Sequence, residues 1–319
     1  MTTTKKSIQL PVLHRTRRVY DNLRICRKCQ NYTVLPGDAC PDCGKQALVP
    51  VTQHARLRAK RKMMNEILFA LLLTIIAVVV SKEVTEIVIS VITGAVCIAV
   101  LVLVQRRMIS KETLRQLARL FKTDSKTIYE GTVRDQSTAV TAVRSGEDVE
   151  GYHMLRQAAV FVHNDRLRLA QLSLLQNFRL RSDMDLDLDS LIVQDFDPLL
   201  AEYIGEIAKI KREMVKDRAI RYVIANEPQI LKLENGMNIL VSVTSAAVRM
   251  KRYVTMYPGF VRRYARFLPK DRFLRLYRMI TSDPAQKDSA MAIDLETIRQ
   301  ELYKGDSDFE PAIPGIGIS

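Results

Sequence analysis

The chain of 319 residues has no tryptophan, and aromatic residues make up only 6% of it. It has four histidines, and it lacks H-E-x-x-H, G-x-S-x-G and a glycine-rich phosphate loop. These absences remove the usual sequence signatures of zinc peptidases, serine hydrolases and nucleotide-binding enzymes. The low aromatic content is a mild argument against a carbohydrate site. We therefore predict no catalytic residues, with an enzyme that uses an unrecognised motif as the alternative.

Cysteine is scarce as well, but four of the five cysteines lie close together in the sequence. They form a C-R-K-C pair and a C-P-D-C pair: Cys26, Cys29, Cys40 and Cys43. Two such pairs, joined by a short loop, can direct four thiolates at one metal ion. Pro41 and Gly44 suit the tight turn of the second pair. Two disulfides or four free thiols are the alternatives.

Residues 21–50, which contain these pairs, resemble the zinc-ribbon family, and the resemblance covers only this part of the chain. One Zn²⁺ ion per chain is expected here. Four cysteine ligands leave no open coordination position, so the metal would be structural rather than catalytic. So short a segment cannot fold by burial alone, and metal ligation would contribute on the order of 10 kcal/mol.

Two apolar runs follow the cysteine pairs. The first spans residues 63–80 and the second residues 87–104, with the polar segment Ser81–Glu86 between them. A helix of about 18 residues is roughly 27 Å long, near the thickness of a bilayer core. Buried helices of a soluble core are the alternative, but the only charged residue in the two runs is Glu66. We predict a two-span transmembrane hairpin over residues 63–105.

Basic residues flank the outer ends of both runs. The positive-inside rule then places both termini in the cytoplasm and makes the protein a multi-pass membrane protein. The residues expected at the membrane surface, or on another anion, are Arg15, Arg17, Arg18, Arg56, Arg58, Lys60, Arg61, Lys62, Arg106 and Arg107.

The net charge of +14 is concentrated near the N-terminus, in the arm 1–20, the ribbon 21–50 and the linker 51–62. Residues 1–62 contain fourteen Lys and Arg against three Asp, whereas the rest of the chain is almost neutral. A basic segment beside a bilayer most simply binds anionic lipid. Lipid or an acidic protein is therefore favoured over nucleic acid, which stays open as a partner.

The hairpin has too few polar residues to line a pore. Ser90 and Gly94 lie four residues apart, and we place Cys97 on the same helix-packing face. Small residues at this spacing let helices approach closely, either the two spans of one chain or two copies of it. We expect a homo-oligomer or a complex with other membrane subunits.

Residues 106–304 are predicted to form an all-α cytoplasmic domain, as a bundle or an α-solenoid, followed by a disordered tail at 305–319. Asn238–Val248 is ambiguous, because its β-branched residues would also suit a strand. The stretch 249–278 is basic and aromatic. Its arginines form a candidate partner surface, or else the outer faces of amphipathic helices: Arg252, Arg262, Arg263, Arg266, Arg272 and Arg275.

The predicted fold class is thus an α-helical membrane protein with an N-terminal zinc ribbon, a transmembrane hairpin and a C-terminal helical domain. The function that these modules favour is a non-catalytic, membrane-anchored adaptor or scaffold that presents a protein-interaction domain. A membrane-tethered nucleic-acid-binding protein and an oligomerising, membrane-perturbing effector are the alternatives.

Overall fold

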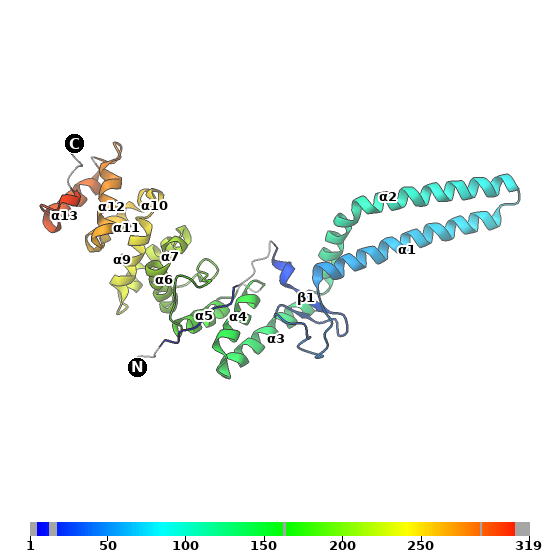
Figure 1. The fold of residues 1–319 in the computed structure, drawn as a ribbon, viewed down its shortest axis with the longest axis horizontal. Coiled ribbons are helices and arrows are strands. Elements are labelled where there is room, and N and C mark those ends of the chain that lie inside the picture. Colours follow the sequence, from blue (N-terminus) through cyan, green and yellow to red (C-terminus); the bar gives the residue numbers. More distant parts are fainter. Residues whose placement is uncertain (1–4, 13–17, 162–163, 288, 310–319) are drawn as a thin grey trace, which may run out of the picture. The chain divides into compact units, whose positions relative to one another are not determined.

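The computed structural model describes residues 5–12, 18–161, 164–287 and 289–309, which exclude Arg15, Arg17 and the tail from residue 310. It is mostly helical, with one small sheet near the N-terminus (Figure 1). Contacts divide the chain into two compact units. One is Leu13–His163, and the other combines Met1–Val12 with Asn164–Ser319.

The first unit begins with a short 3₁₀ helix, Val19–Asn22, and a three-stranded antiparallel sheet. The strands are β1 (Arg24–Cys26), β2 (Tyr32–Thr33) and β3 (Leu48–Pro50), in the order β2-β1-β3. Ile25 of β1 pairs with Tyr32 on one side and with Val49 on the other. The central strand therefore carries the first cysteine of the C-R-K-C pair.

Two long helices follow the sheet directly. They are α1 (Val51–Val80) and α2 (Val84–Thr123), and they pack against each other as an extended hairpin (Figure 1). The linker predicted at residues 51–62 is the first part of α1. Both helices extend beyond the apolar runs, so the sheet connects to the hairpin without a flexible joint.

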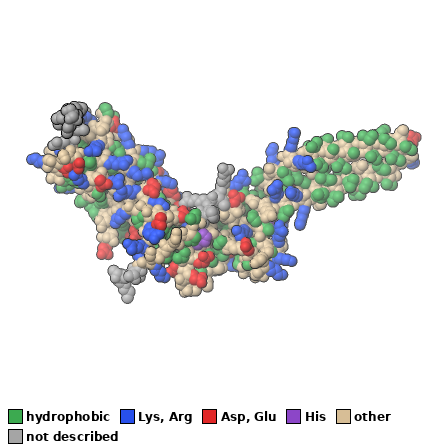
Figure 2. All heavy atoms as spheres, viewed as in Figure 1, with side chains coloured by type: hydrophobic (Ala, Val, Ile, Leu, Met, Phe, Trp, Pro, Cys, Tyr) green, Lys and Arg blue, Asp and Glu red, His purple; other side chains and the backbone are tan. Residues whose placement is uncertain are grey.

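The apolar parts of α1 and α2 pack against each other, but they are not buried among the other described residues. None of the most apolar 18-residue window of either helix is buried. Figure 2 shows hydrophobic side chains over the visible face of the outer hairpin, and Lys and Arg at its base. Both helices are long and apolar enough to cross a membrane. A core helix of a soluble protein would be mostly buried instead.

Helices α3 (Ser125–Arg144) and α4 (Asp148–Ala159) complete the first unit. Its core joins the sheet to the helices, because Leu23, Ile25 and Tyr32 cluster with Leu117 and Leu120 of α2. This explains why the observed division falls after His163, whereas the sequence placed a boundary at residue 106. Of the apolar face predicted at residues 114–121, Leu117, Leu120 and Phe121 pack on the ribbon, whereas Leu114 is exposed.

Among its described residues, the second unit consists of helices and their connections, of which residues 177–197 are the longest, and one isolated bridge joins Lys6 to Phe178. Asp197 caps α6 (Pro198–Ile210) by accepting a hydrogen bond from the Leu199 N–H, as the Asp197-Pro198 pair predicts. Asn238–Val248 lies almost entirely in a helix, so the strand alternative is wrong there. The helices are α5 (Asp165–Gln176), α6 (Pro198–Ile210), α7 (Asp217–Ala225), α8 (Glu227–Ile230), α9 (Gly236–Ala247), α10 (Lys251–Met256), α11 (Pro258–Tyr264), α12 (Lys270–Thr281) and α13 (Ala290–Leu302), with 3₁₀ turns at Arg212–Met214, Ala265–Phe267 and Ser307–Phe309.

Candidate metal centre

The four cysteines predicted as metal ligands meet at one point in the first unit. Their sulfur atoms all lie within 4.8 Å of one another. The Sγ atoms of Cys26 and Cys43 are 3.7 Å apart, and those of Cys29 and Cys40 are 3.6 Å apart. These distances are too long for disulfides, and all four thiols are free. A tetrahedral ion with Zn–S bonds of 2.3 Å would separate its sulfurs by about 3.8 Å, so the cluster has the right size for such an ion.

Two matching backbone turns aim the cysteines at this point. The Gln30 N–H donates to the Cys26 carbonyl over 2.9 Å, and the Gly44 N–H donates to the Cys40 carbonyl over the same distance. Gln30 and Gly44 occupy equivalent positions, one residue after each pair, with φ of 63° and 67°. The sequence indicated Gly44 but missed Gln30, which adopts the left-handed conformation without being glycine.

Without a bound cation, the thiols of Cys26 and Cys29 differ strongly in acidity. Burial opposes ionisation of Cys26, but the backbone N–H groups of Cys29 and Lys28 stabilise its thiolate, and its pKa falls to about 7. Burial raises the pKa of Cys29 to about 12, and the neighbouring thiols contribute. Four sulfurs so close together cannot all ionise unless a positive charge compensates them. The donor set suits a thiophilic divalent metal.

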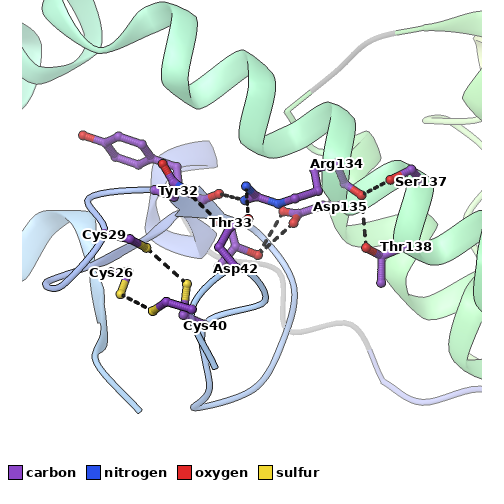
Figure 3. A network of polar contacts seen from close by, with 12 residues as sticks. Cys26, Cys29, Tyr32, Thr33, Cys40, Asp42, Arg134, Asp135, Ser137 and Thr138 are labelled. Carbon is purple, nitrogen blue, oxygen red and sulfur yellow. Dashed lines mark hydrogen bonds and ion pairs between the residues drawn. The ribbon is translucent and has the colours of Figure 1, made fainter. Parts of the chain in front are cut away.

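A carboxylate from a distant helix fixes the strand that leads out of the first turn. Asp135 of α3 is fully buried. It accepts hydrogen bonds from the Val34 N–H at 2.7 Å and from the Thr33 hydroxyl at 3.0 Å (Figure 3). Burial raises the pKa of Asp135, while these two donors stabilise its charged form. The sheet is thereby attached to α3 and not only to the chain on either side of it.

Four further contacts hold the ribbon near the same helix. The Tyr32 hydroxyl donates to Asp124 at 2.6 Å, and burial followed by this hydrogen bond raises the pKa of Tyr32. Arg134 donates to the Tyr32 carbonyl at 2.9 Å and pairs with Asp42 at 2.6 Å (Figure 3). Gly131 lies against the Tyr32 carbonyl, whose carbon would be 3.1 Å from a Cβ atom at position 131. Only glycine permits this approach of α3 to β2.

Seven of the ten predicted membrane-surface residues lie where the apolar parts of the hairpin begin. Arg56, Arg58, Lys60 and Arg61 are exposed on α1, and Arg106 and Arg107 are exposed on α2. Lys62 differs from them, because it pairs with Glu112 of α2 at 2.9 Å. This ion pair is the first cause of a lowered pKa at Glu112. Arg18 donates to the Tyr20 hydroxyl. Binding of these residues to lipid stays a prediction.

The helix-packing residues divide into two groups. Ser90 and Gly94 are partly buried, and Gly94 contacts Thr74 of α1. Cys97 is exposed and does not share this face. The packing side of α2 follows residues 87, 90, 94, 98 and 101, so that position 97 lies one residue away from it. Packing between the two spans of one chain is therefore the arrangement that the structure has.

The arginines of the candidate partner surface have partners within their own unit. Arg262 pairs with Asp294, Arg263 with Glu227, Arg266 with Glu301 and Arg272 with Asp271. Arg275 donates to the Arg249 carbonyl, and Arg252 lies over the Tyr253 ring. Phe260, Tyr264 and Phe273 are buried. These contacts favour the amphipathic-helix alternative, while the partner surface stays a prediction.

Comparison of the chain with protein-family models, curated proteins and solved structures finds no match in any of the three.

Proposed function

We propose that the protein is a membrane-anchored adaptor, in which a two-span hairpin holds a structural zinc ribbon and a helical interaction domain at one membrane surface. The observation that carries this proposal is the junction between ribbon and hairpin. Helix α1 starts at Val51, immediately after β3, and Leu117 and Leu120 of α2 pack on the ribbon core. A metal module fixed in this way to the base of two apolar helices is positioned for contacts close to the membrane.

The uncovered apolar surface supports membrane insertion. Large hydrophobic residues such as Leu72, Ile76 and Ile92 are about half exposed along the hairpin. Exposure of an apolar surface of this extent to water is unfavourable, whereas a helix that crosses the hydrocarbon core of a bilayer needs such a surface. At its base, Gln105 donates to the Met63 carbonyl and to Glu66, so that the polar groups at the edge of the apolar region are satisfied within the hairpin.

Charge supports the orientation of the hairpin. The turn between the spans, residues 81–86, has one Lys and two Glu, whereas arginine and lysine gather at the opposite end (Figure 2). Cationic residues remain on the cytoplasmic side during insertion. A cytoplasmic ribbon also agrees with free thiols, since a reducing compartment keeps them available for zinc.

Labelling with a membrane-impermeant thiol reagent tests this topology. A cysteine introduced at Ser81 should be labelled in intact cells, and one introduced at exposed Lys126 should be labelled only after permeabilisation. Labelling of position 126 in intact cells, with position 81 labelled only after permeabilisation, would reverse the orientation. Labelling of both positions only after permeabilisation, in protein found in the soluble fraction, would exclude insertion.

The adaptor role itself is tested by purification from native membranes in mild detergent. We expect a partner protein to co-purify at a constant ratio with the wild-type chain, and to be lost when Cys43→Ser disrupts the ribbon while the chain stays in the membrane. Cys97→Ser is the matched control, because Cys97 is the exposed fifth cysteine. A wild-type chain that elutes without any stoichiometric partner would contradict the proposal.

A further inference from the structure

A basic hollow lies between the first cysteine turn and helix α1. Its volume is about 660 Å³, and it is lined by Arg27 and Gln30 of the turn and by His54, Leu57, Arg58 and Arg61 of α1. The four α1 residues share one face of the helix, because they are spaced at three, four and seven positions. The hollow therefore belongs to the rigid junction between the ribbon and the hairpin.

The positive charge in this hollow is not compensated by the chain. No carboxylate lines it, and within the described part of the chain the guanidinium groups of Arg27, Arg58 and Arg61 have no ion-pair partner. Nearby cations behave differently, since Lys62 pairs with Glu112 and Arg134 with Asp42. Three like charges around one space repel each other, and an anion bound in that space would offset this repulsion.

The arginines of the hollow also act on His54. Burial is the main cause of a lowered pKa at His54. The positive charges of Arg58, Arg27 and Arg61 lower it further. Its Nε2 is buried and has no hydrogen-bond partner among the described residues. Asp124 is the one acidic group that acts on it in the opposite direction. A neutral imidazole beside three arginines leaves a polar nitrogen that a ligand or a water molecule could satisfy.

The hollow is also close to the apolar part of the hairpin. Arg61 precedes Met63 by two residues, and Arg58 precedes it by five, which is about 7.5 Å of helix. The exposed Leu57 adds an apolar wall. No Phe, Tyr or Trp side chain lines the space, so it lacks the large aromatic rings on which successive nucleic-acid bases commonly stack.

We infer that this hollow binds the phosphate group of an anionic phospholipid headgroup, and that arginines at the ribbon and on α1 hold it together. Guanidinium groups suit phosphate because they donate two parallel hydrogen bonds to its oxygens. The inference rests on the proposed membrane location and adds a specific ligand to it. A bound headgroup would fix the ribbon against the bilayer surface.

Lipid retention by the full chain in detergent tests the inference. The probes are radiolabelled phosphatidic acid, whose headgroup is a phosphate monoester, and phosphatidylserine. The wild type should prefer phosphatidic acid. Arg58→Gln/Arg61→Gln should lose about fivefold in affinity for each arginine removed, together with this preference.

The matched control is Lys60→Gln/Arg106→Gln, which removes the same charge from the same end of the hairpin but outside the hollow. It should weaken both lipids equally and keep the preference. Equal effects of the two double variants on the preference would overturn the inference, because they would indicate a diffuse surface charge. Adding Arg27→Gln should reduce binding further, and the metal content of that triple variant shows whether the ribbon is intact.

Competitors distinguish the sources of the phosphate. Inorganic phosphate should displace the lipid only weakly, and displacement as effective as by phosphatidic acid would overturn the lipid headgroup as the ligand. A single-stranded oligonucleotide that binds more tightly than the lipid, and loses affinity steeply with salt, would assign the hollow to nucleic acid and also overturn it. Since lipid binding is measured in detergent, its failure is separate from a failure of the labelling test for insertion.

Discussion

The backbone of Gly94 in α2 lies against Thr74 of α1, so closely that a Cβ atom at position 94 would be 2.7 Å from Oγ1 of Thr74 and 3.0 Å from its Cβ. Thr74 cannot move aside easily, because its side chain is β-branched and its hydroxyl donates to the Ala70 carbonyl at 2.9 Å. The small residue thus serves the packing of one hairpin. The predicted oligomer stays a prediction that needs another interface.

Gly94→Ala should therefore destabilise the hairpin by about 1–3 kcal/mol, the usual effect of adding a methyl group to a filled contact. The measurement is thermal unfolding of the full chain in detergent. The Thr74→Ala background should reduce this penalty, since it removes Oγ1 and Cγ2. Ala99→Leu, on the exposed side of α2, is the control and should have little effect. Equal penalties in both backgrounds would contradict the assigned contact.

Removal of the metal should unfold the ribbon. We expect one zinc ion per purified chain. A chelator should release this ion, and strands β1, β2 and β3 should then unfold. The lost binding energy is on the order of 10 kcal/mol, because the ribbon has few apolar residues of its own. Cys43→Ser should abolish stoichiometric zinc, and Cys97→Ser should retain it. Reduced, folded protein without any metal would exclude the zinc centre.

The two turn residues should respond to substitution in opposite directions. Gln30→Gly should stabilise the ribbon by up to about 1 kcal/mol, because glycine adopts a φ of 63° without strain. The loss of the 3.2 Å hydrogen bond from Gln30 to the Arg27 carbonyl reduces this gain. Gly44→Ala should destabilise the ribbon by about 1 kcal/mol. Zinc affinity measured by competition with a chelator reports both changes, and a shared sign would contradict the assigned turns.

The spacing of the cysteines was sufficient to predict their cluster, because two C-x-x-C pairs impose their own local turns. The attachment of the ribbon to α3 was not predicted. Asp135 lies about a hundred residues from Thr33 in sequence, and a local sequence pattern does not predict a contact over such a separation. A usable signal did exist: Gly131 and Asp135 are four apart in an otherwise polar helix, and the two define the face that approaches β2.

The basic aromatic stretch shows why charge in a sequence is a weak guide to a binding surface. Between residues 249 and 278 the chain has a large excess of arginine and lysine. The compensating carboxylates come from elsewhere in the same unit, such as Glu227 for Arg263 and Asp294 for Arg262. The hollow beside Arg58 and Arg61 differs, because no carboxylate is brought to it.

Asp135 should be the main polar contact between the ribbon and α3. Asp135→Ala leaves the Val34 N–H and the Thr33 hydroxyl without a buried acceptor, so we expect a loss of about 1–3 kcal/mol in the free energy of unfolding. Asp135→Asn keeps one acceptor oxygen and should cost less. In the Asp135→Ala variant, the rate of hydrogen exchange at the Val34 amide should increase even under conditions that leave the population of globally unfolded protein unchanged.

The pH dependence of Asp135 should have an unusual sign. Its pKa in the folded protein lies above the unfolded value, so the folded state binds the proton more tightly. The contribution of Asp135 to stability therefore decreases as pH rises through that window. The difference in stability between wild type and Asp135→Asn should follow this direction. A difference that is lost as pH falls would show that the carboxylate is stabilised by its donors more than it is penalised by burial.

The second unit should contain a carboxylate with the opposite behaviour. The pKa of Glu296 is lowered from 4.5 to about 2, mainly by a hydrogen bond from Arg299. The Tyr277 hydroxyl donates a second hydrogen bond to this carboxylate, at 2.8 Å. Because the folded pKa is depressed, this stabilisation is present above pH 4.5 and is lost as pH falls toward 2. The side chain of Glu296 is 39% exposed, so solvent screening limits the effect to about 1 kcal/mol.

Tyr277→Phe tests this assignment, because it removes one donor from Glu296 and leaves the ring in the aromatic cluster with Phe273 and Phe309. The pKa of Glu296, followed by carboxyl-carbon NMR, should rise toward its usual value, and acid destabilisation of this unit should begin at a higher pH. Tyr303→Phe is the matched control, since Tyr303 stacks on the same Phe273 and Phe309 rings, whereas the hydroxyl that donates to Glu296 is that of Tyr277. If both variants shift the Glu296 titration equally, the change comes from altered packing of the cluster and the hydroxyl of Tyr277 is not the cause.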